Sequence, residues 1–329
     1  MNRLFVMMLA LIMGLSAVPG FAAADSTATA DSPDNIEVIA SAPENGWVKT
    51  DTDTFYYVDG VKLKGFQEIE GETYYFGSST GKMYKGFTKV GGSKYYFGKT
   101  TGKMYRGVHK IGRNVYTFND QGVLVRTVYG SKKAVALTYD DGPSDNTATI
   151  LDALEKNGGL ATFFVVGNRL GSYPKSAARA VEMGCQIANH SWSHPYYEKL
   201  SDSEIKSQIS KTNAKIKEIS GHSCQVARTP GGSNAQRIKS AVNMPIILWS
   251  IDTLDWKTRN ADSTYNTVMN KVKDGDIILM HDLYKATASA SVRFIPKLVA
   301  EGYQLVTVQE LALLKGVKLQ NGVVYTSMR

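Results

Sequence analysis

The sequence predicts an α/β protein: a distorted (β/α) barrel of about seven parallel strands, preceded by a solenoid module of β-hairpin repeats. Two observations predict this fold class. Residues 64–84 and 85–105 align without gaps as two copies of a 21-residue block rich in glycine and aromatic residues, which is typical of stacked hairpins. From Ser131 onward, short β-branched and aromatic runs alternate with helical patterns some seven times, which indicates a parallel sheet covered by helices.

The N-terminus has the pattern of a secretory signal peptide. Arg3 precedes an apolar run, residues 4–18, that is too short to span a bilayer, and Ala22-Ala23-Ala24 offers a small-residue cleavage site. No other apolar run approaches the roughly 20 residues of a transmembrane helix. We therefore expect an exported protein. Its expected segments are a signal peptide at 1–24, a disordered acidic linker at 25–44, the repeats at 45–129, the barrel domain at 130–318 and a C-terminal tail at 319–329.

The charge of the chain indicates which classes of partner it can bind, and its cysteine content limits the disulfides that it can form. The linker carries five acids and no base, whereas residues 45–129 have 13 Lys+Arg against 7 Asp+Glu and residues 130–329 have 24 against 18. This moderate excess of bases suits an anionic polymer such as a bacterial wall, or serves only solubility. No basic run with a recognition motif points to nucleic acid. Cys185 and Cys224 permit one disulfide, but Cys185 lies in an apolar run, so we favour a buried free thiol.

The repeats begin and end in degenerate copies. The two aligned blocks, KGFQEIEGETYYFGSSTGKMY and KGFTKVGGSKYYFGKTTGKMY, are flanked by weaker copies from Asn45 and Arg106. One hairpin cannot bury its own aromatic face, so the copies must stack, and the rings between neighbours can hold sugars or quaternary amines. The array resembles the cell-wall-binding, choline-binding-like repeats of secreted proteins from bacteria with thick walls. Only Trp47 keeps the GW that this family often has, which weakens the prediction of choline itself, and a stalk without a ligand is the alternative.

The barrel domain alternates strands and helices. The helical patterns include a capping box, Ser201-x-x-Glu204, before the longest of them. The predicted strands are 132–139, 161–167, 185–189, 225–229, 245–251, 276–281 and 303–308, and the predicted helices are 145–157, 173–184, 201–221, 264–275 and 291–302.

Polar clusters follow five of the predicted strands. In barrels of this kind the reactive groups stand on loops after the carboxyl ends of strands. His190 and His194 alone are ambiguous, because paired loop histidines are often only polar surface, and Ser191 stands where a zinc-protease helix needs glutamate. Five clusters at equivalent strand ends are a stronger signal. They are TYDDGP at 138–143, HSWSH at 190–194, RTPGG at 228–232, DTLDW at 252–256 and LMHD at 279–282.

These clusters resemble, in order, the five motifs of the polysaccharide deacetylase family, whose catalytic domain also occurs in peptidoglycan, chitin and chito-oligosaccharide deacetylases and in acetylxylan esterases. The resemblance covers residues 131 to about 315. It implies a metal site formed by Asp141, His190 and His194, with zinc as the expected ion and cobalt, nickel or manganese as alternatives.

The same resemblance implies the acid–base groups. Asp140 would be the general base that takes a proton from water, and Arg228 would pair with it. His281 would protonate the departing amine, oriented by Asp255.

The resemblance also implies a substrate pocket. The backbone N–H of Gly231 would stabilise the oxyanion, and Trp256 and Leu279 would wall the space for the acetyl methyl. Many members carry an aromatic residue at the position of Gly231, so one side of the substrate groove loses a ring here. Ser233 lacks the G-x-S-x-G elbow of serine hydrolases.

Together these observations predict a secreted, metal-dependent hydrolase that removes acetyl groups from N-acetylglucosamine in peptidoglycan. The repeats would hold it on the wall through peptidoglycan, teichoic acid or another glycan. The nearest alternative keeps the chemistry and changes the substrate, to acetylated xylan or to chitin and chito-oligosaccharides. An alternative of another class is a non-catalytic wall-binding protein with an inert barrel.

Overall fold

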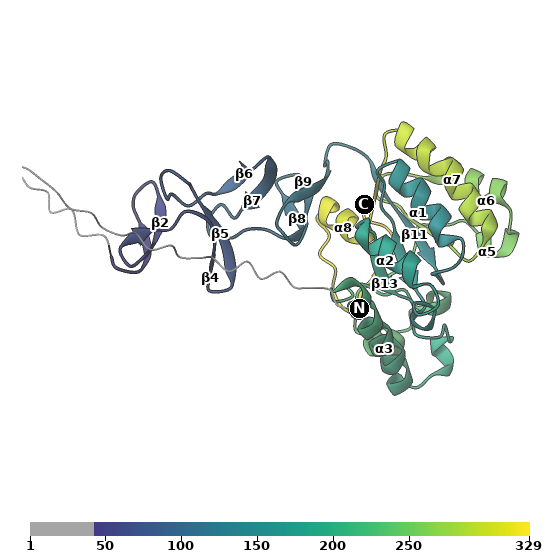
Figure 1. Cartoon of the computed structure of the whole chain (residues 1–329). Helices are drawn as coiled ribbons and strands as arrows, with labels where there is room; N and C mark the ends of the chain where they lie inside the picture. Colours follow the sequence, from purple (N-terminus) through teal and green to yellow (C-terminus); the bar gives the residue numbers. More distant parts are fainter. Residues whose placement is uncertain (1–42) are drawn as a thin grey trace, which may run out of the picture.

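The computed structural model describes residues 43–329, so the predicted signal peptide and the predicted linker up to residue 42 lie outside the described residues. Figure 1 shows a row of hairpins that leads into an α/β part built around a parallel sheet. Across the described range, no helix combines the length and apolar character needed to cross a membrane.

The hairpin part is made of short antiparallel strands that pair only with their neighbours in sequence. Two outer sheets have three strands each and two inner hairpins have two, which confirms the predicted repeat module. The strands are β1 Gly46–Lys49, β2 Thr54–Val58, β3 Val61–Lys62, β4 Gly65–Ile69, β5 Glu72–Phe76, β6 Gly86–Val90, β7 Ser93–Phe97, β8 Gly107–Ile111, β9 Asn114–Phe118 and β10 Leu124–Val128.

Aromatic rings join each hairpin to the next. The ring of Phe66 lies 4.8 Å from that of Tyr75 on its own hairpin and 5.1 Å from that of Tyr95 on the following one. The TGKMY segment adds a second contact, because Met83 packs on Gly102, where a Cβ would overlap the methionine side chain. Gly102 also has a φ of +71°, which a glycine adopts readily. The repeat therefore specifies stacking as well as turns.

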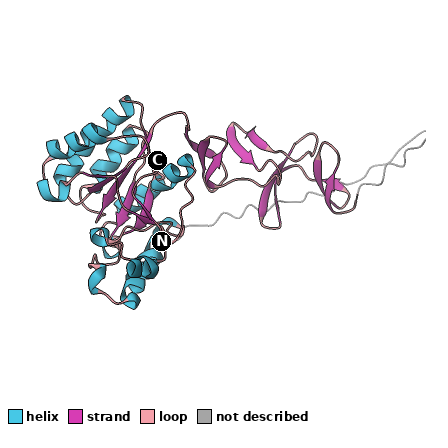
Figure 2. Ribbon diagram, turned by 180° about the vertical axis from the view of Figure 1, so that it is seen from behind, coloured by secondary structure: helices cyan, strands magenta, loops and turns pink. Residues whose placement is uncertain are grey.

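The α/β part contains the expected parallel sheet, with helices around it (Figure 2). Its strand order is β13-β12-β11-β16-β15, and β17 pairs with the first half of β11. Single-residue bridges through Ala227 extend the sheet from β13 to β14, which also pairs with β18. The strands are β11 Ala134–Asp140, β12 Thr162–Val165, β13 Gln186–Asn189, β14 Ile246–Ile247, β15 Ile251–Asp252, β16 Ile277–His281, β17 Gln304–Val306 and β18 Val324–Tyr325.

This arrangement confirms the predicted fold class and differs from the prediction in detail, because the main sheet has six strands where about seven were predicted. The run 225–229 contributes only bridges, and the run 245–251 breaks into β14 and β15. The break lies where Arg228 donates from Nε to the carbonyl of Ile247 at 2.8 Å and from Nη2 to the carbonyl of Leu248 at 2.9 Å, in place of strand pairing. β18 lies in the segment expected to be a tail.

Helices cover the sheet, and the predicted capping box of Ser201 and Glu204 is present at the start of α3. A second capping box, of Thr307 and Glu310, begins α8. The helices are α1 Thr147–Lys156, α2 Pro174–Glu182, α3 Asp202–Ser220, α4 Gln236–Val242, α5 Asp255–Thr258, α6 Ala261–Lys271, α7 Lys285–Ala300 and α8 Val308–Lys315. Sequence patterns missed α4, α5 and α8 and placed the start of α7 six residues late, because short or largely buried helices have a weak polar face.

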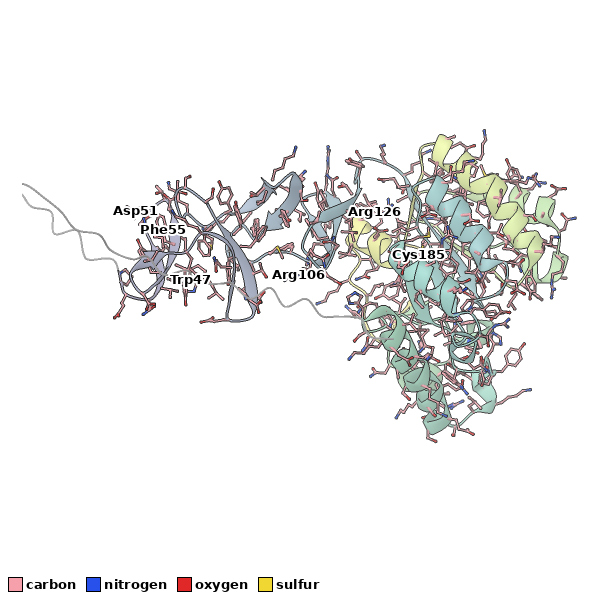
Figure 3. The ribbon with its side chains drawn as sticks, in the orientation of Figure 1. Trp47, Asp51, Phe55, Arg106, Arg126 and Cys185 are labelled. Atoms are coloured by element: carbon pink, nitrogen blue, oxygen red, sulfur yellow. The ribbon has the colours of Figure 1, made fainter. Side chains whose placement is uncertain are left out.

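The last hairpin packs directly on the α/β part. Val115 and Val128 belong to the same buried apolar cluster as the start of α8. Arg126, labelled at this junction in Figure 3, donates from Nε to Oε1 of Glu310 at 2.9 Å and from Nη2 to the carbonyl of Leu305 at 2.8 Å. A continuous core therefore crosses the expected boundary between the repeats and the barrel domain.

Both cysteines are free thiols. Cys185 is buried under α2, and its burial raises the pKa of the thiol to about 12. Cys224 is half-buried. The preference for a free thiol over a disulfide agrees with the structure.

Candidate active site

The five polar clusters lie at one edge of the sheet. Asp140 is the last residue of β11 and His281 is the last residue of β16. His190 directly follows β13, Asp255 lies shortly after β15, and Arg228 follows the bridge that extends the sheet beyond β13. Because parallel strands end at a common edge, side chains far apart in the sequence meet there.

Asp141, His190 and His194 form a compact set of metal-ligand atoms. Oδ1 of Asp141 lies 3.2 Å from Nε2 of His194 and 3.4 Å from Nε2 of His190, and one atom from each residue lies within 4.8 Å of the others. Two ligands placed about 2.0–2.1 Å from a tetrahedral ion are about 3.3 Å apart. Oδ1 of Asp141 is buried without a hydrogen-bond partner among the described residues. The donor set and its spacing therefore fit a divalent cation.

The backbone around these ligands is held in an uncommon conformation. Asp141, Ser191 and His194 have φ values of +70°, +69° and +59°. A non-glycine residue in this region raises the energy by on the order of 1–3 kcal/mol, so the surroundings must compensate. The side chain of Ser191 accepts a hydrogen bond from the N–H of His194 at 2.8 Å, and that of Asn189 accepts one from the N–H of Ser191 at 2.8 Å. Such strain at a ligand loop is typical of a functional site.

A backbone contact fixes the tautomer of His190. Its Nδ1 lies 2.7 Å from the carbonyl oxygen of Arg228, which can only accept, so Nδ1 carries the hydrogen and donates. Nε2, which faces Asp141, is then the atom available to a metal.

The charges of the site shift the pKa values of these groups. Burial raises the pKa of Asp141, but the neighbouring His190, with the charges of His194 and His281, lowers it to about 2. Burial lowers the pKa of His190, whereas Asp140 and Asp141 raise it by a larger amount. Burial and the charge of His190 lower the pKa of His194. The carboxylate charge that favours a proton on His190 equally favours a bound cation.

Asp140 is held by a fully buried arginine. Nη1 of Arg228 donates to Oδ1 of Asp140 at 2.7 Å and to the hydroxyl of Thr138 at 2.8 Å. The guanidinium stacks over the ring of Phe164, with 4.1 Å from Cζ to the ring centroid. Oδ2 of Asp140 lies 3.6 Å from Nε2 of His190. One carboxylate oxygen is thus fixed by Arg228, while the other faces the metal ligands.

Asp255 and His281 form a second charged pair. Nδ1 of His281 donates to Oδ1 of Asp255 at 2.8 Å, and the same carboxylate accepts from the backbone N–H of His281 at 2.7 Å and from the hydroxyl of Thr287 at 2.7 Å. Burial lowers the pKa of His281, but the hydrogen bond of Asp255 and the charges of Asp140, Asp255 and Asp141 raise it to about 9. His281 therefore carries a proton at neutral pH and suits a general acid.

The predicted substrate contacts are less closely grouped. Gly231 has a φ of +66° and lies at the rim of the site, where a Cβ would approach a ring carbon of Tyr196 to 3.1 Å. Tyr196 is 57% exposed, and its ring lies against Gly231. Trp256 is half-exposed at the start of α5, and Leu279 is buried in β16. Trp256 and Leu279 share no hydrogen bond or ring contact with the metal ligands in the described part of the chain, and their pocket roles stay predictions.

A groove of about 620 Å³ begins at the metal ligands. Asp141 and His194 line one part of it, and Asn168, Arg169 and Tyr173 line another. Asn168, Arg169 and Tyr173 were not among the site residues predicted from the sequence. The signal was available, because Asn168 and Arg169 directly follow the predicted strand 161–167 and so stand at a sixth strand end of the same edge.

Comparisons with known proteins agree with this geometry. Residues 127–245 match the polysaccharide deacetylase family, and residues 63–108 match the choline-binding repeat. A family 4 acetyl xylan esterase from Clostridium thermocellum, solved in complex with a cobalt ion, is 36% identical with a TM-score of 0.57, covering 59% of this chain and 98% of that chain. This chain belongs to the polysaccharide deacetylase family.

Two peptidoglycan-acting members of the family are similar over the same region. Peptidoglycan-N-acetylmuramic acid deacetylase PdaC of Bacillus subtilis is 43% identical over 190 residues, which are 57% of this chain and 41% of that protein. Peptidoglycan-N-acetylglucosamine deacetylase PgdA of Listeria monocytogenes is 40% identical over 196 residues, 59% of this chain and 41% of that protein. The chain thus spans about two fifths of the length of these curated relatives.

Proposed function

We propose that this protein is a metal-dependent deacetylase that hydrolyses the acetamide of amino sugars in peptidoglycan and releases acetate. The observation that carries the proposal is the meeting, at one sheet edge, of three metal-ligand side chains with a buried Asp140–Arg228 pair and a protonated His281. Water activation, oxyanion stabilisation and leaving-group protonation are the three tasks of amide hydrolysis, and we propose one group at this edge for each task.

The cation would be held by Asp141, His190 and His194. As a Lewis acid it supplies polarisation of the acetyl carbonyl and makes water more acidic. Asp140 would take the proton of the attacking water, since its free carboxylate oxygen faces the ligands while Arg228 fixes the other. The N–H of Gly231 would donate to the carbonyl oxygen as that oxygen gains negative charge.

His281 would complete the reaction by giving its proton to the nitrogen of the breaking C–N bond. An amine leaves poorly as an anion, so a donor that is protonated at neutral pH is required. Asp255 would orient His281 through Nδ1, which leaves Nε2 for the leaving nitrogen. Water is consumed, and acetate and a free amino sugar are the products.

We propose zinc as the cation, because two imidazoles and one carboxylate with open positions suit catalytic zinc. Cobalt, nickel and manganese bind the same donor types, and the related esterase solved with cobalt supports that breadth. Trp256 and Leu279 are proposed to wall the acetyl pocket.

We propose that the protein is secreted through the signal peptide at residues 1–24 and that the repeats at 45–129 hold the catalytic domain at 130–318 on the wall. The match to the choline-binding repeat supports a wall glycan or teichoic acid as their ligand.

Acetate release tests the function. Purified, metal-replete protein should release acetate and create free amines on peptidoglycan, and should prefer it to acetylxylan and to N-acetyl chito-oligosaccharides. A strong preference for xylan would favour the esterase alternative. Asp140→Asn should abolish acetate release while the protein still sediments with cell walls, whereas a non-catalytic wall-binding protein would release no acetate in either form.

A further inference from the structure

Arg169 is the last residue of a short 3₁₀ helix, residues 167–169, directly after β12, and it lines the groove that begins at Asp141 and His194. Its side chain is half-buried, and its Nε donates to the carbonyl of Pro143 at 3.3 Å. Within residues 43–329, its two Nη groups have no hydrogen-bond partner and no carboxylate within ion-pair distance. The groove therefore contains a guanidinium whose two Nη groups have no acceptor among the described residues.

The other arginines of the α/β part are already engaged. Arg259 stacks on the ring of Tyr284, with 3.6 Å from Cζ to the ring centroid. The rest form ion pairs with carboxylates, and they are Arg179, Arg228, Arg237, Arg293 and Arg329. Arg169 is thus the one arginine in this part of the described chain that has neither an ion pair with a carboxylate nor a contact over an aromatic ring.

The lining of the groove favours an anion beside Arg169, whose charge otherwise acts on the fully buried Asp282 outside that lining. Asp141 is the one acidic side chain among the described residues of the lining, and it is engaged by His190 and His194. Ser172 and Tyr173 line the groove directly before α2, which has no acidic residue in its first turn, so the positive end of the helix dipole adds to the charge of Arg169. Asn168 and Ser193 supply neutral polar groups of the kind that bind sugar hydroxyls.

From this placement we infer that Arg169 is a specificity-determining residue that binds a carboxylate of the glycan substrate. The inference rests on the proposed function and restricts its substrates to glycans that bear a carboxylate. A planar guanidinium binds a carboxylate through two parallel hydrogen bonds, which neutral chitin and xylan cannot accept in that form. In peptidoglycan the carboxylate has two sources, which are the lactyl group of muramic acid where no peptide is attached and the stem peptide where one is. Either source places an anion within a sugar or two of the acetamide that is cleaved.

Binding and turnover of three glycans test the inference: neutral N-acetyl chito-oligosaccharides, peptidoglycan strands stripped of peptide, and peptide-bearing fragments. Arg169→Gln should raise KM for the carboxylate-bearing glycans about tenfold or more and leave KM for chito-oligosaccharides unchanged. Arg169→Lys should retain part of the binding, because lysine keeps the positive charge but lacks the two parallel N–H donors of the guanidinium. Arg179→Gln, on α2 and outside the groove lining, is the matched control.

Dissociation constants in the Asp140→Asn background separate this inference from the proposed function. Weaker binding by Arg169→Gln of stripped strands would identify the lactyl carboxylate, and weaker binding of peptide-bearing fragments alone would identify the stem peptide. An equal effect on all three glycans, or none on the charged ones, would overturn the assignment. Absence of acetate release by the unmodified protein would contradict the proposed function, while the dissociation constants would still decide the role of Arg169.

Discussion

Replacing Asp255 by asparagine tests the acid half of the proposed chemistry. His281 has a pKa of about 9, against an ordinary value of 6.5, and the first group that raises it is Asp255. The protonated form is the active acid, so activity is present below the folded pKa and is lost as pH rises through it. Asp255→Asn keeps an oxygen for Nδ1 of His281 but removes the negative charge. The pKa of His281 must therefore fall, and the alkaline limb of the pH profile of kcat must move to lower pH.

The size of the effect follows from the titration of His281. At pH 8 a group with a pKa of about 9 is roughly nine-tenths protonated, and a group at the ordinary 6.5 is about 3% protonated. Asp255→Asn should therefore lower kcat for the amide at pH 8, by roughly thirtyfold if the pKa of His281 returns to the ordinary 6.5, and much less at pH 6. A pH profile of kcat from 5.5 to 10, measured as acetate release from a soluble N-acetylated glycan, records the shift.

Two controls separate this effect from simple damage. Asp252→Asn changes the other carboxylate of the DTLDW segment, at the end of β15. Asp252 accepts from the N–H of Leu254 and has no hydrogen bond or ion pair with His281, so the alkaline limb of this variant should stay in place. An activated acetyl ester needs no proton on its leaving group, so Asp255→Asn should affect it far less. An alkaline limb that stays at the same pH in Asp255→Asn would refute the assignment of His281 as an acid tuned by Asp255.

Three further changes test the substrate surface, the junction and the repeats. Tyr196→Ala should raise KM for long glycans about threefold to tenfold with kcat little changed, because an exposed ring beside the site stacks on sugar, and an unchanged KM would remove this residue from the substrate surface. Glu310→Ala should lower the free energy of unfolding by about 3 kcal/mol, because it removes the carboxylate that pairs with the largely buried Arg126. If the full-length variant unfolds at the same temperature as the unmodified protein, the shared core is contradicted. Gly102→Ala should lower the melting temperature of the repeats more than Gly107→Ala does, because both have positive φ but only the first would place a Cβ against a neighbouring side chain. Equal shifts in circular dichroism melts would show that the stacking contact is unimportant.

Local patterns were sufficient for the fold class and for the edge at which the site lies. Apolar runs and strand-end polar clusters place Asp140, His190 and His281 together once parallel strands are assumed, because such strands end at one edge. The capping box at Ser201 was likewise visible, since its signal lies within four residues.

Features that depend on contacts between distant segments were not visible. The sequence pattern of residues 245–251 predicts one strand, yet Arg228 donates hydrogen bonds to two of its carbonyls where the strand is interrupted. The ring of Tyr196 reaches Gly231 from another loop, and nothing in either segment indicates the meeting. The shared core at Glu310 crosses a boundary that composition placed at residue 129. Arg169 is a different case, because its position after a predicted strand carried the signal.

The central claim is that Asp141, His190 and His194 hold one cation on which acetate release depends. The direct measurement is a titration of chelator-treated protein with Zn²⁺, following bound metal by mass spectrometry and acetate release from peptidoglycan in the same samples. Bound metal and acetate release should rise together and saturate near one equivalent of Zn²⁺ per chain, and His194→Ala should lose both. Full acetate release by the metal-depleted protein, or metal binding unchanged in His194→Ala, would contradict it.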